Sequence, residues 1–243
     1  MQTGAAIMLL GMVRALVRAV EAKDFYTCRH SEQVAHYAVH LAQRLGLESK
    51  AVESIRIAAL LHDVGKIGVP DHILVKPGPL TEEEFAIVRR HPGMGAEILS
   101  HIAMLDQEAV LVRHHHERWD GGGYPEGLCG DQTPLGARLI QIADCIDAML
   151  MERTYKKCYS PAKMIDELIR CAGKQFDPVL AGEAVQWCRD NPDKLILPRK
   201  QPSRQALERL SAHAKTGPPR PFRPVVCVEP LTVALRLLGR GES

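Results

Sequence analysis

Three adjacent histidines stand directly before a glycine-rich segment in the stretch HHHERWDGGGYPEGL, which begins at His114. An earlier stretch, LLHDVGKIGVP, places His62 beside Asp63. Imidazole and carboxylate donors together suit manganese, iron or zinc better than metals that prefer thiolates. Neighbouring residues on a helix project about 100° apart, so the imidazole would bind one ion while the carboxylate bridges two. A His-Asp pair alone is weak evidence, because Asp63 could simply orient His62.

Further donors fall at the ends or in the interiors of successive expected helices. Helical bundles assemble dinuclear metal centres from donors on separate helices in this way. We expect the other histidines, such as His36, His40, His72, His101 and His213, to be ordinary core or surface residues. The candidate set is His30, His62, Asp63, His91, His115, His116 and Asp144.

Helical periodicity dominates the first three quarters of the chain, and no alternating pattern of useful length predicts a strand. We therefore expect an all-α domain. Helices are predicted over residues 31–46, ending at Gly46, and over residues 51–65. The expected helix starts are Ser31, Thr81 with Glu84 as a capping box, Thr133 before Pro134, and Asp177 before Pro178.

The composition is that of an ordinary globular protein, with 46% hydrophobic and 25% charged residues among 243. A formal charge of +2 is too small to indicate a nucleic-acid polymer or a membrane as partner, so attraction for phosphate must be local. The seven cysteines form no C-x-x-C pair, which favours a reducing, cytoplasmic compartment. The apolar start is interpreted as an amphipathic helix, and no run is long enough to span a membrane.

The character of the sequence changes near residue 192. Residues 1–192 are predicted to form one domain, and residues 193–243 a Pro- and Arg-rich tail with helices around 203–215 and 230–239. The tail could be a docking element, a partner site or a loosely packed extension.

Several motifs in order resemble the HD-GYP family, a subgroup of the HD-domain metal-dependent phosphohydrolases. They are HDVGK at 62–66, RRHPGMGAEIL around His91, HHERWDGGGYP at 115–125 and IADCIDAM at 142–149, and the resemblance covers roughly residues 15–185. It implies a bacterial HD-domain helical bundle with an HD-GYP extension. Such proteins hydrolyse cyclic di-GMP to pGpG and often onward to GMP, with iron or manganese at a site of two or three metals.

The resemblance also implies roles for individual residues. The seven donors match metal ligands, and Asp63 matches the ligand that bridges two ions. Asp63 and Lys66 are the implied catalytic residues, and Lys66 meets the scissile phosphate. Glu117 and Asp120 are expected to fix imidazole tautomers, and His114 to lie outside the motif. The implied substrate-binding residues are Lys66, Gly123, Tyr124 and Pro125 at a rigid lip, Asp147 beside a ligand or the leaving group, and Arg153 and Lys156 on the second phosphate and guanine.

One position departs from the family. Some members carry a glutamate four residues before the first histidine, where it helps to hold a third metal, but this chain has Tyr26. We therefore expect two divalent ions. No receiver-, PAS- or GAF-like region precedes the domain, so we expect sensory input to be missing or supplied by another chain.

Three functions are compatible with these motifs. The leading one is hydrolysis of cyclic di-GMP. A second keeps the metals but changes the substrate to another cyclic dinucleotide, such as cGAMP, or to a nucleotide monoester. The third is a binding module that senses the dinucleotide or docks a GGDEF-type or other signalling protein.

Overall fold

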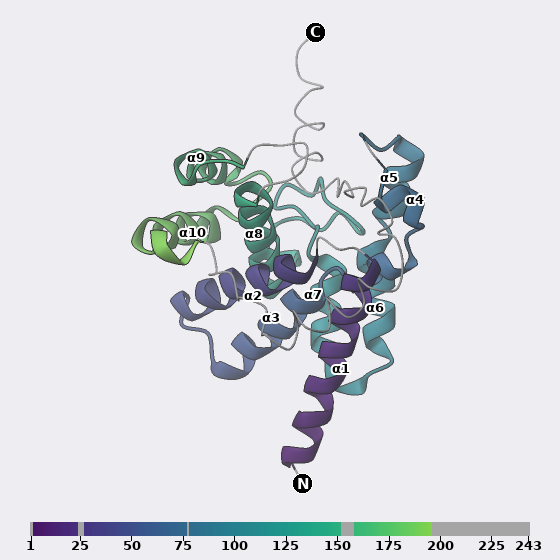
Figure 1. Cartoon of the computed structure of the whole chain (residues 1–243). Helices are drawn as coiled ribbons and strands as arrows, with labels where there is room; N and C mark the ends of the chain where they lie inside the picture. Colours follow the sequence, from purple (N-terminus) through teal and green to yellow (C-terminus); the bar gives the residue numbers. More distant parts are fainter. Residues whose placement is uncertain (1, 24–26, 77, 152–157, 196–243) are drawn as a thin grey trace, which may run out of the picture.

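The computed structural model describes residues 2–23, 27–76, 78–151 and 158–195, and its regular elements are helical (Figure 1). Within these ranges there are two isolated β-bridges and no strand, so the expected all-α class is confirmed. The α-helices are α1 (Gln2–Lys23), α2 (Thr27–Arg44), α3 (Ser49–Leu61), α4 (Asp71–Leu74), α5 (Glu82–Val88), α6 (His91–Ser100), α7 (Asp106–His114), α8 (Leu135–Leu150), α9 (Pro161–Cys171) and α10 (Pro178–Asp190). The 3-10 helices are η1 (Val64–Gly68), η2 (Ala103–Leu105), η3 (Gly130–Gln132) and η4 (Pro192–Lys194).

Helix α8 forms the centre of the bundle. Its sequence is apolar on nearly every side, and its residues are buried from Gly136 to Met149 except for Arg138. A helix that is hydrophobic all round must be surrounded by other elements, and α2, α3, α7, α9 and α10 all contact it. The two polar residues Asp144 and Asp147 are thus carried into the interior.

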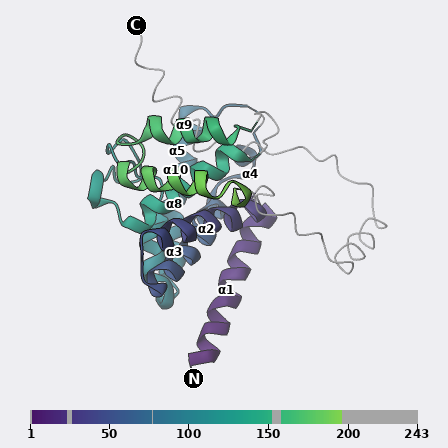
Figure 2. The ribbon, with the colours of Figure 1, turned by 90° about the vertical axis from the view of Figure 1, so that its left-hand side faces the viewer.

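Helix α1 lies at the edge of the bundle. Val13 and Val20 are buried in the main core, whereas Ile7 and Met8 near the N-terminus are exposed. Figures 1 and 2 show this end of the helix projecting away from the other helices. No helix in the described part of the chain is both long and apolar enough to cross a membrane.

Three expected helix boundaries are wrong. Helix α2 begins at Thr27, so Ser31 lies inside the helix and does not cap it. Helix α3 ends at Leu61, because the chain turns at His62 and continues as a 3-10 helix. Helix α8 begins at Leu135 with Pro134 as its N-cap, one residue later than expected, so Thr133 is not the cap.

The other local signals are confirmed. Thr81 and Glu84 form the complete capping box of α5. The Asp177 carboxylate accepts hydrogen bonds from the backbone N–H groups of Val179 and Leu180 at the start of α10. Gly46, with φ of 72°, ends α2 as a residue in the left-handed region.

The described chain remains packed up to its last residue, Leu195. The backbone oxygen of Leu195 accepts hydrogen bonds from the Tyr37 hydroxyl and from the Gln33 amide on α2. The two helices predicted within the tail lie outside the described residues.

Candidate metal centre

The fold brings all seven predicted metal donors together. They form three overlapping groups in which the ligand atoms lie within 4.8 Å of one another. The groups are His30, His62 and Asp144; His62, Asp63 and His115; and His91, His115 and His116. The donors come from α2, the end of α3, the start of α6, the end of α7 and the middle of α8.

Asp63 lies between the two outer groups. Its Oδ2 atom is 3.5 Å from His62 Nε2 and 3.9 Å from His30 Nε2. Its other oxygen, Oδ1, is 3.5 Å from His91 Nε2. Each carboxylate oxygen therefore faces a different group of histidines, as a carboxylate bridging two ions requires.

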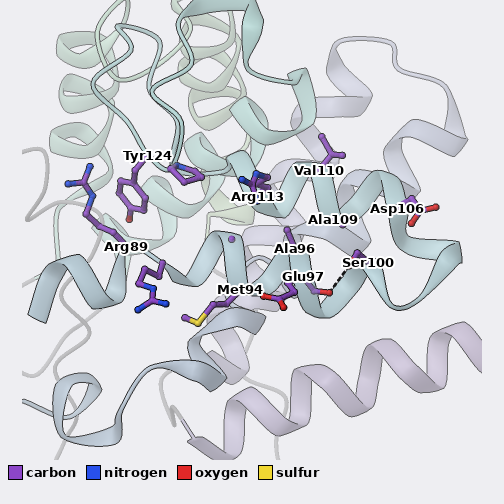
Figure 3. Close-up of a pocket in the computed structure, with 13 residues that line it drawn as sticks. Arg89, Met94, Ala96, Glu97, Ser100, Asp106, Ala109, Val110, Arg113 and Tyr124 are labelled. Carbon is purple, nitrogen blue, oxygen red and sulfur yellow. Dashed lines mark hydrogen bonds between the residues drawn. The ribbon is translucent and has the colours of Figure 1, made fainter.

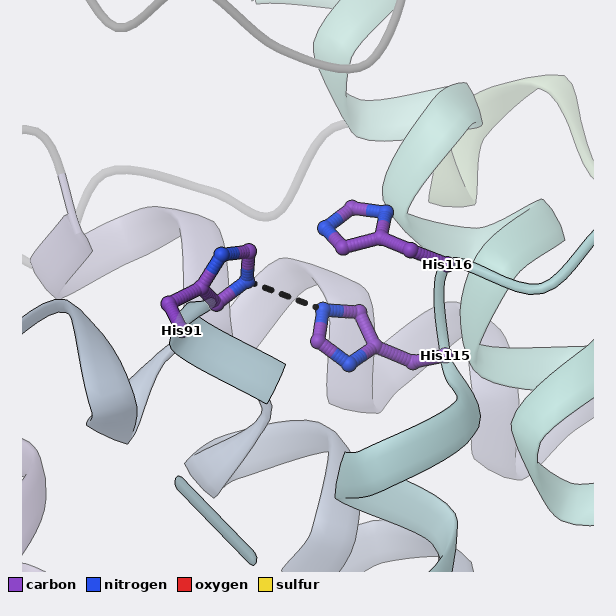
Figure 4. Close-up of side chains that lie close together, drawn as sticks. All are labelled: His91, His115 and His116. Carbon is purple, nitrogen blue, oxygen red and sulfur yellow. Dashed lines mark hydrogen bonds between the residues drawn. The ribbon is translucent and has the colours of Figure 1, made fainter. Parts of the chain in front are cut away.

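Three of the imidazoles are oriented by the same local hydrogen bond. Each uses Nδ1 to reach the backbone oxygen three residues earlier, at 2.8 Å for His62 to Ala59, 2.8 Å for His91 to Val88 and 2.6 Å for His115 to Val112. A carbonyl oxygen only accepts, so Nδ1 must carry the proton. Nε2 is then the unprotonated nitrogen and can bind a metal. Figure 4 shows His91, His115 and His116 converging, with 3.4 Å between the Nε2 atoms of His91 and His115.

His30 is oriented by carboxylates. Its Nδ1 lies 2.7 Å from Asp147 Oδ2, and its Nε2 lies 3.2 Å from Asp144 Oδ1. Asp147 was expected to orient either a ligand or the leaving group. The buried carboxylate is placed to hold the His30 ring, so a contact between Asp147 and substrate stays a prediction.

A backbone contact brings Asp63 beside His91. A Cβ atom on Gly65 would lie 1.9 Å from the His91 backbone oxygen and 2.5 Å from the Gly95 nitrogen. Only glycine allows η1 to pack directly against the first turn of α6. The motifs HDVGK and HPGMG contain the glycines concerned, but this packing role is not among the expectations from the sequence.

Lys66 is buried beside the proposed bridge. Its ammonium group lies 2.8 Å from Asp63 Oδ2 and only 4% of the residue is exposed. Burial raises the pKa of Asp63, but Lys66 and the surrounding imidazoles outweigh this effect and hold the pKa well below its usual range. The carboxylate is therefore ionised and able to bind cations.

The imidazoles differ in their preferred charge. Burial lowers the pKa of His62, and burial with neighbouring imidazoles lowers that of His115 well below its usual value. Burial also acts to lower the pKa of His30, but Asp144 and Asp147 outweigh it and raise the pKa to about 10. The buried carboxylates of Asp63, Asp144 and Asp147 thus stabilise positive charge in their surroundings.

Glu117 and Asp120 hold the loop that follows the histidines and do not orient the metal-site imidazoles. This corrects the expectation that both residues fix imidazole tautomers. Glu117 accepts hydrogen bonds from the backbone N–H groups of Glu126 at 2.7 Å and Leu128 at 3.0 Å. Asp120 pairs with Arg118 and accepts from the Gly122 N–H at 3.0 Å. Both carboxylates thus stabilise the turn over residues 117–128.

The glycines of this loop serve the loop's own packing. Among the three consecutive glycines 121–123, only Gly121 has a positive φ, of 77°. A Cβ on Gly123 would lie 2.4 Å from the Arg118 nitrogen and 2.6 Å from the His116 oxygen. Gly123 therefore allows a close approach of backbone to backbone within the loop.

Tyr124, within this loop, and His114, just before it, are both buried. Tyr124 is buried and packs its ring against His116, with 4.8 Å between ring centroids, and the Tyr124–Pro125 peptide bond is cis. His114 is also buried, and its Nδ1 lies 3.8 Å from Glu117 Oε1. Arg153, Lys156 and Tyr26 lie outside the described residues.

The site has the donors that a dinuclear centre needs: five imidazoles, one carboxylate between two groups, and a second carboxylate on a neighbouring helix. These nitrogen and oxygen donors suit borderline divalent metals. The fold and the site thus define a helical protein with a buried cluster of donors that could hold two divalent metal ions.

A family model described as HD domain matches residues 14–180. The chain belongs to the HD domain family, as its resemblance to HD-GYP proteins predicted. It is 42% identical over 165 residues to the cyclic di-GMP phosphodiesterase response regulator RpfG of Xanthomonas campestris, covering 67% of this chain and 44% of that protein. It is 40% identical over 171 residues to 3'3'-cGAMP-specific phosphodiesterase 2 of Vibrio cholerae, covering 70% of this chain and 33% of the relative. The chain thus spans less than half the length of these relatives.

Solved structures support the fold. A cyclic GMP-AMP-specific phosphodiesterase of V. cholerae, V-cGAP3, matches with a TM-score of 0.59 and 17% identity, covering 94% of this chain and 58% of the other. An HDG"Y"P protein of Bdellovibrio bacteriovorus, Bd1817, matches with a TM-score of 0.56 and 21% identity, covering 67% of this chain and 52% of the other. At these identities the likeness concerns the fold alone.

Proposed function

We propose that this domain is a metal-dependent phosphodiesterase that hydrolyses cyclic di-GMP to pGpG or, in the manner of some family members, onward to GMP. One observation carries the proposal: the two oxygens of Asp63 face two separate histidine groups, with the ammonium of Lys66 buried at the same carboxylate. The names of the relatives from Xanthomonas campestris and Thermotoga maritima support this substrate.

The proposed cofactor is a pair of divalent ions, iron or manganese. Such a pair supplies a water of lowered pKa and polarises the phosphate for in-line attack. The His62, His91 and His115 rings would present Nε2 to the ions because each Nδ1 proton is given to a backbone oxygen. Lys66 supplies a fixed positive charge where negative charge develops on the phosphate oxygens.

Substrate binding would involve residues around this centre. Gly123, Tyr124 and Pro125 form the loop beside His116 and are proposed as the lip of the substrate site. Asp147, which contacts His30, is also proposed to contact the substrate. Arg153 and Lys156 are proposed to hold the second phosphate and the guanine.

A second substrate is favoured by a specific observation. Relatives about as similar as RpfG are named 3'3'-cGAMP-specific phosphodiesterases. The metal ligands act on the phosphodiester and do not read the base, so the same centre would serve either cyclic dinucleotide.

We further propose that residues 1–192 form the phosphodiesterase domain and residues 193–243 a Pro- and Arg-rich tail, whose first residues up to Leu195 pack on the domain. A GGDEF-type or other signalling protein is the proposed partner, by resemblance to the family. A reducing, cytoplasmic compartment fits the absence of a disulfide at Cys129, Cys145, Cys158, Cys171 and Cys188.

The test is hydrolysis by full-length protein purified anaerobically with Mn(II) or Fe(II). Cyclic di-GMP, 3'3'-cGAMP and cyclic di-AMP would be supplied separately, and the products resolved by chromatography. We expect metal-dependent turnover of cyclic di-GMP, and accumulation of either pGpG or GMP defines the product.

Three results would reject the proposal. Turnover of 3'3'-cGAMP without turnover of cyclic di-GMP would transfer the function to the second substrate. Protein that binds two ions per chain but cleaves none of the three dinucleotides would contradict both, and protein that binds no metal would favour the binding module.

A further inference from the structure

An open groove of about 880 Å³ is lined mainly by residues of α6 and α7 (Figure 3). Its floor includes Met94, Ala96 and Ala109, and Arg89, Tyr124 and Pro125 lie at one end. The proposed mechanism gives no role to any of the groove's arginines. One of them, Arg89, contacts Tyr124, and Tyr124 packs on His116, a proposed metal ligand.

Arg89, Tyr124 and His116 form a continuous stack from this groove to the centre. The guanidinium carbon of Arg89 lies 4.8 Å from the centroid of the Tyr124 ring. The Tyr124 ring lies 4.8 Å from the His116 ring at an interplanar angle of 31°. His116 in turn belongs to the donor group with His91 and His115.

Arg89 is held in place by its own element. It is the C-cap of α5, and its backbone N–H donates to the Phe85 oxygen at 2.9 Å. Its guanidinium group also lies 5.6 Å from the Phe85 ring, so one cation covers two aromatic rings. Figure 3 shows Arg89 beside the Tyr124 ring.

A metal-binding imidazole must be held within fractions of an ångström of its productive position. Tyr124 restrains His116 through ring packing and through the bond from the Tyr124 N–H to the His116 oxygen at 3.2 Å. Arg89 covers the Tyr124 ring in turn. We propose that Arg89 is a positioning residue that acts through Tyr124 on His116, and so links the outer groove to the geometry of the metal centre.

This inference rests on the proposed function, because it assigns His116 to a metal. Its test uses five variants of the full-length protein: Arg89→Ala, Arg89→Lys, Tyr124→Leu, the double variant Arg89→Ala/Tyr124→Leu, and Arg90→Ala. Arg90 is the matched control, since it is exposed, lines the same groove and makes no ion pair or ring contact in the described part of the chain. Affinity for Mn(II) would be measured by chelator competition, and kcat and KM with bis(4-nitrophenyl) phosphate.

We expect Arg89→Ala to weaken binding of the Mn(II) ion held by His116 about two- to fivefold, which is the size of a cation–π contact at an exposed site. Tyr124→Leu should weaken it about tenfold or more. Arg89→Lys should restore most of the affinity, and Arg90→Ala should leave it unchanged. Because Arg89 acts through Tyr124, the Arg89→Ala change should have no further effect in the Tyr124→Leu protein.

Three outcomes would overturn the inference: wild-type affinity in Arg89→Ala, an equal loss in Arg90→Ala, or an undiminished effect of Arg89→Ala in the Tyr124→Leu background. A change in KM without a change in metal affinity would also overturn it, because it would indicate direct contact with substrate. Melting temperatures establish that each variant is folded. If the affinities behave as expected while no cyclic dinucleotide is cleaved, the proposed substrate fails and the positioning role stands.

Discussion

At the scale of single residues, Asp63 does what no histidine of the site can do. Its two oxygens point to different histidine groups, and Lys66 keeps it ionised despite its burial. An imidazole has one free nitrogen for a metal, so only a carboxylate can join two ions. The centre therefore depends on Asp63 more than on any one imidazole.

We predict that Asp63→Asn lowers phosphodiesterase activity by at least about a hundredfold, because loss of a metal ligand exceeds the effect of losing a residue that only supports one. An amide keeps the shape of the side chain but removes the charge that holds two cations. Turnover and metal content per chain would be measured together. Asp166→Asn, a change on the exposed face of α9, is the control.

Retention of both metals and full turnover in Asp63→Asn would contradict the bridging role. Loss of turnover with both metals retained would assign Asp63 to the reaction but not to metal binding.

At the scale of elements, glycines set the distances between the segments that carry the donors. Gly65 lets η1 touch α6, and Gly123 lets the loop fold back on the backbone of Glu117 and Arg118. Both contacts are too short for a Cβ atom. The positions of His91 and His116 thus depend on residues that have no side chain.

We predict that Gly123→Ala destabilises the protein by about 1–3 kcal/mol, the usual cost of forcing an extra carbon into a packed region. Backbone atoms of three residues would have to move, and His116 is one of them. The free energy of unfolding would be measured by chemical denaturation, alongside Mn(II) affinity. Gly122→Ala is the matched control, because its nearest neighbours at 3.2 and 3.4 Å are side-chain atoms that can rotate away.

Equal stability of the two glycine variants would show that the loop relaxes freely around residue 123. In that case the loop would not fix the position of His116.

At the scale of the whole molecule, the metal-free protein carries an opposed set of buried charges. His30 has its pKa raised to about 10, so its favourable contacts are fully present below pH 6.5 and are lost as the pH rises towards 10. The pKa values of His62 and His115 are lowered, so they contribute above pH 6.5 and lose that contribution as the pH falls. The stability of the metal-free protein therefore falls on both sides of pH 6.5, the ordinary histidine pKa.

We predict that the metal-free protein is most stable near pH 6.5 and loses stability between pH 6.5 and 8.5. The loss contributed by His30 is on the order of a few kcal/mol. Melting temperatures in the presence of a chelator would measure it. The window stops at pH 8.5 because buried Cys145 and Cys188 also have raised pKa values and add their own loss above that range.

The control is His30→Gln, which should flatten this alkaline slope. A slope that persists in His30→Gln would assign it to other groups. Adding Mn(II) should raise the melting temperature of the wild type at pH 7.5, because the folded state alone presents the assembled donors.

The sequence by itself determined the all-α class, the family and the identity of the seven donors. These follow from local periodicity, caps such as Thr81 with Glu84, and motifs whose residues are close in the chain. The errors were local too. Ser31 and Thr133 are misplaced as helix starts because neighbouring residues begin these helices, and the end of α3 is misplaced because a 3-10 helix follows it directly.

Only the tertiary structure decided how the donors are used. The contact of Asp147 with His30 spans 117 residues, and nothing in either segment specifies it. The same holds for which Asp63 oxygen faces which histidine, and for the contacts that run from His116 through Tyr124 to Arg89. Such contacts arise from the packing of whole helices, in which side-chain directions are fixed by distant neighbours and not by the spacing of residues along the chain.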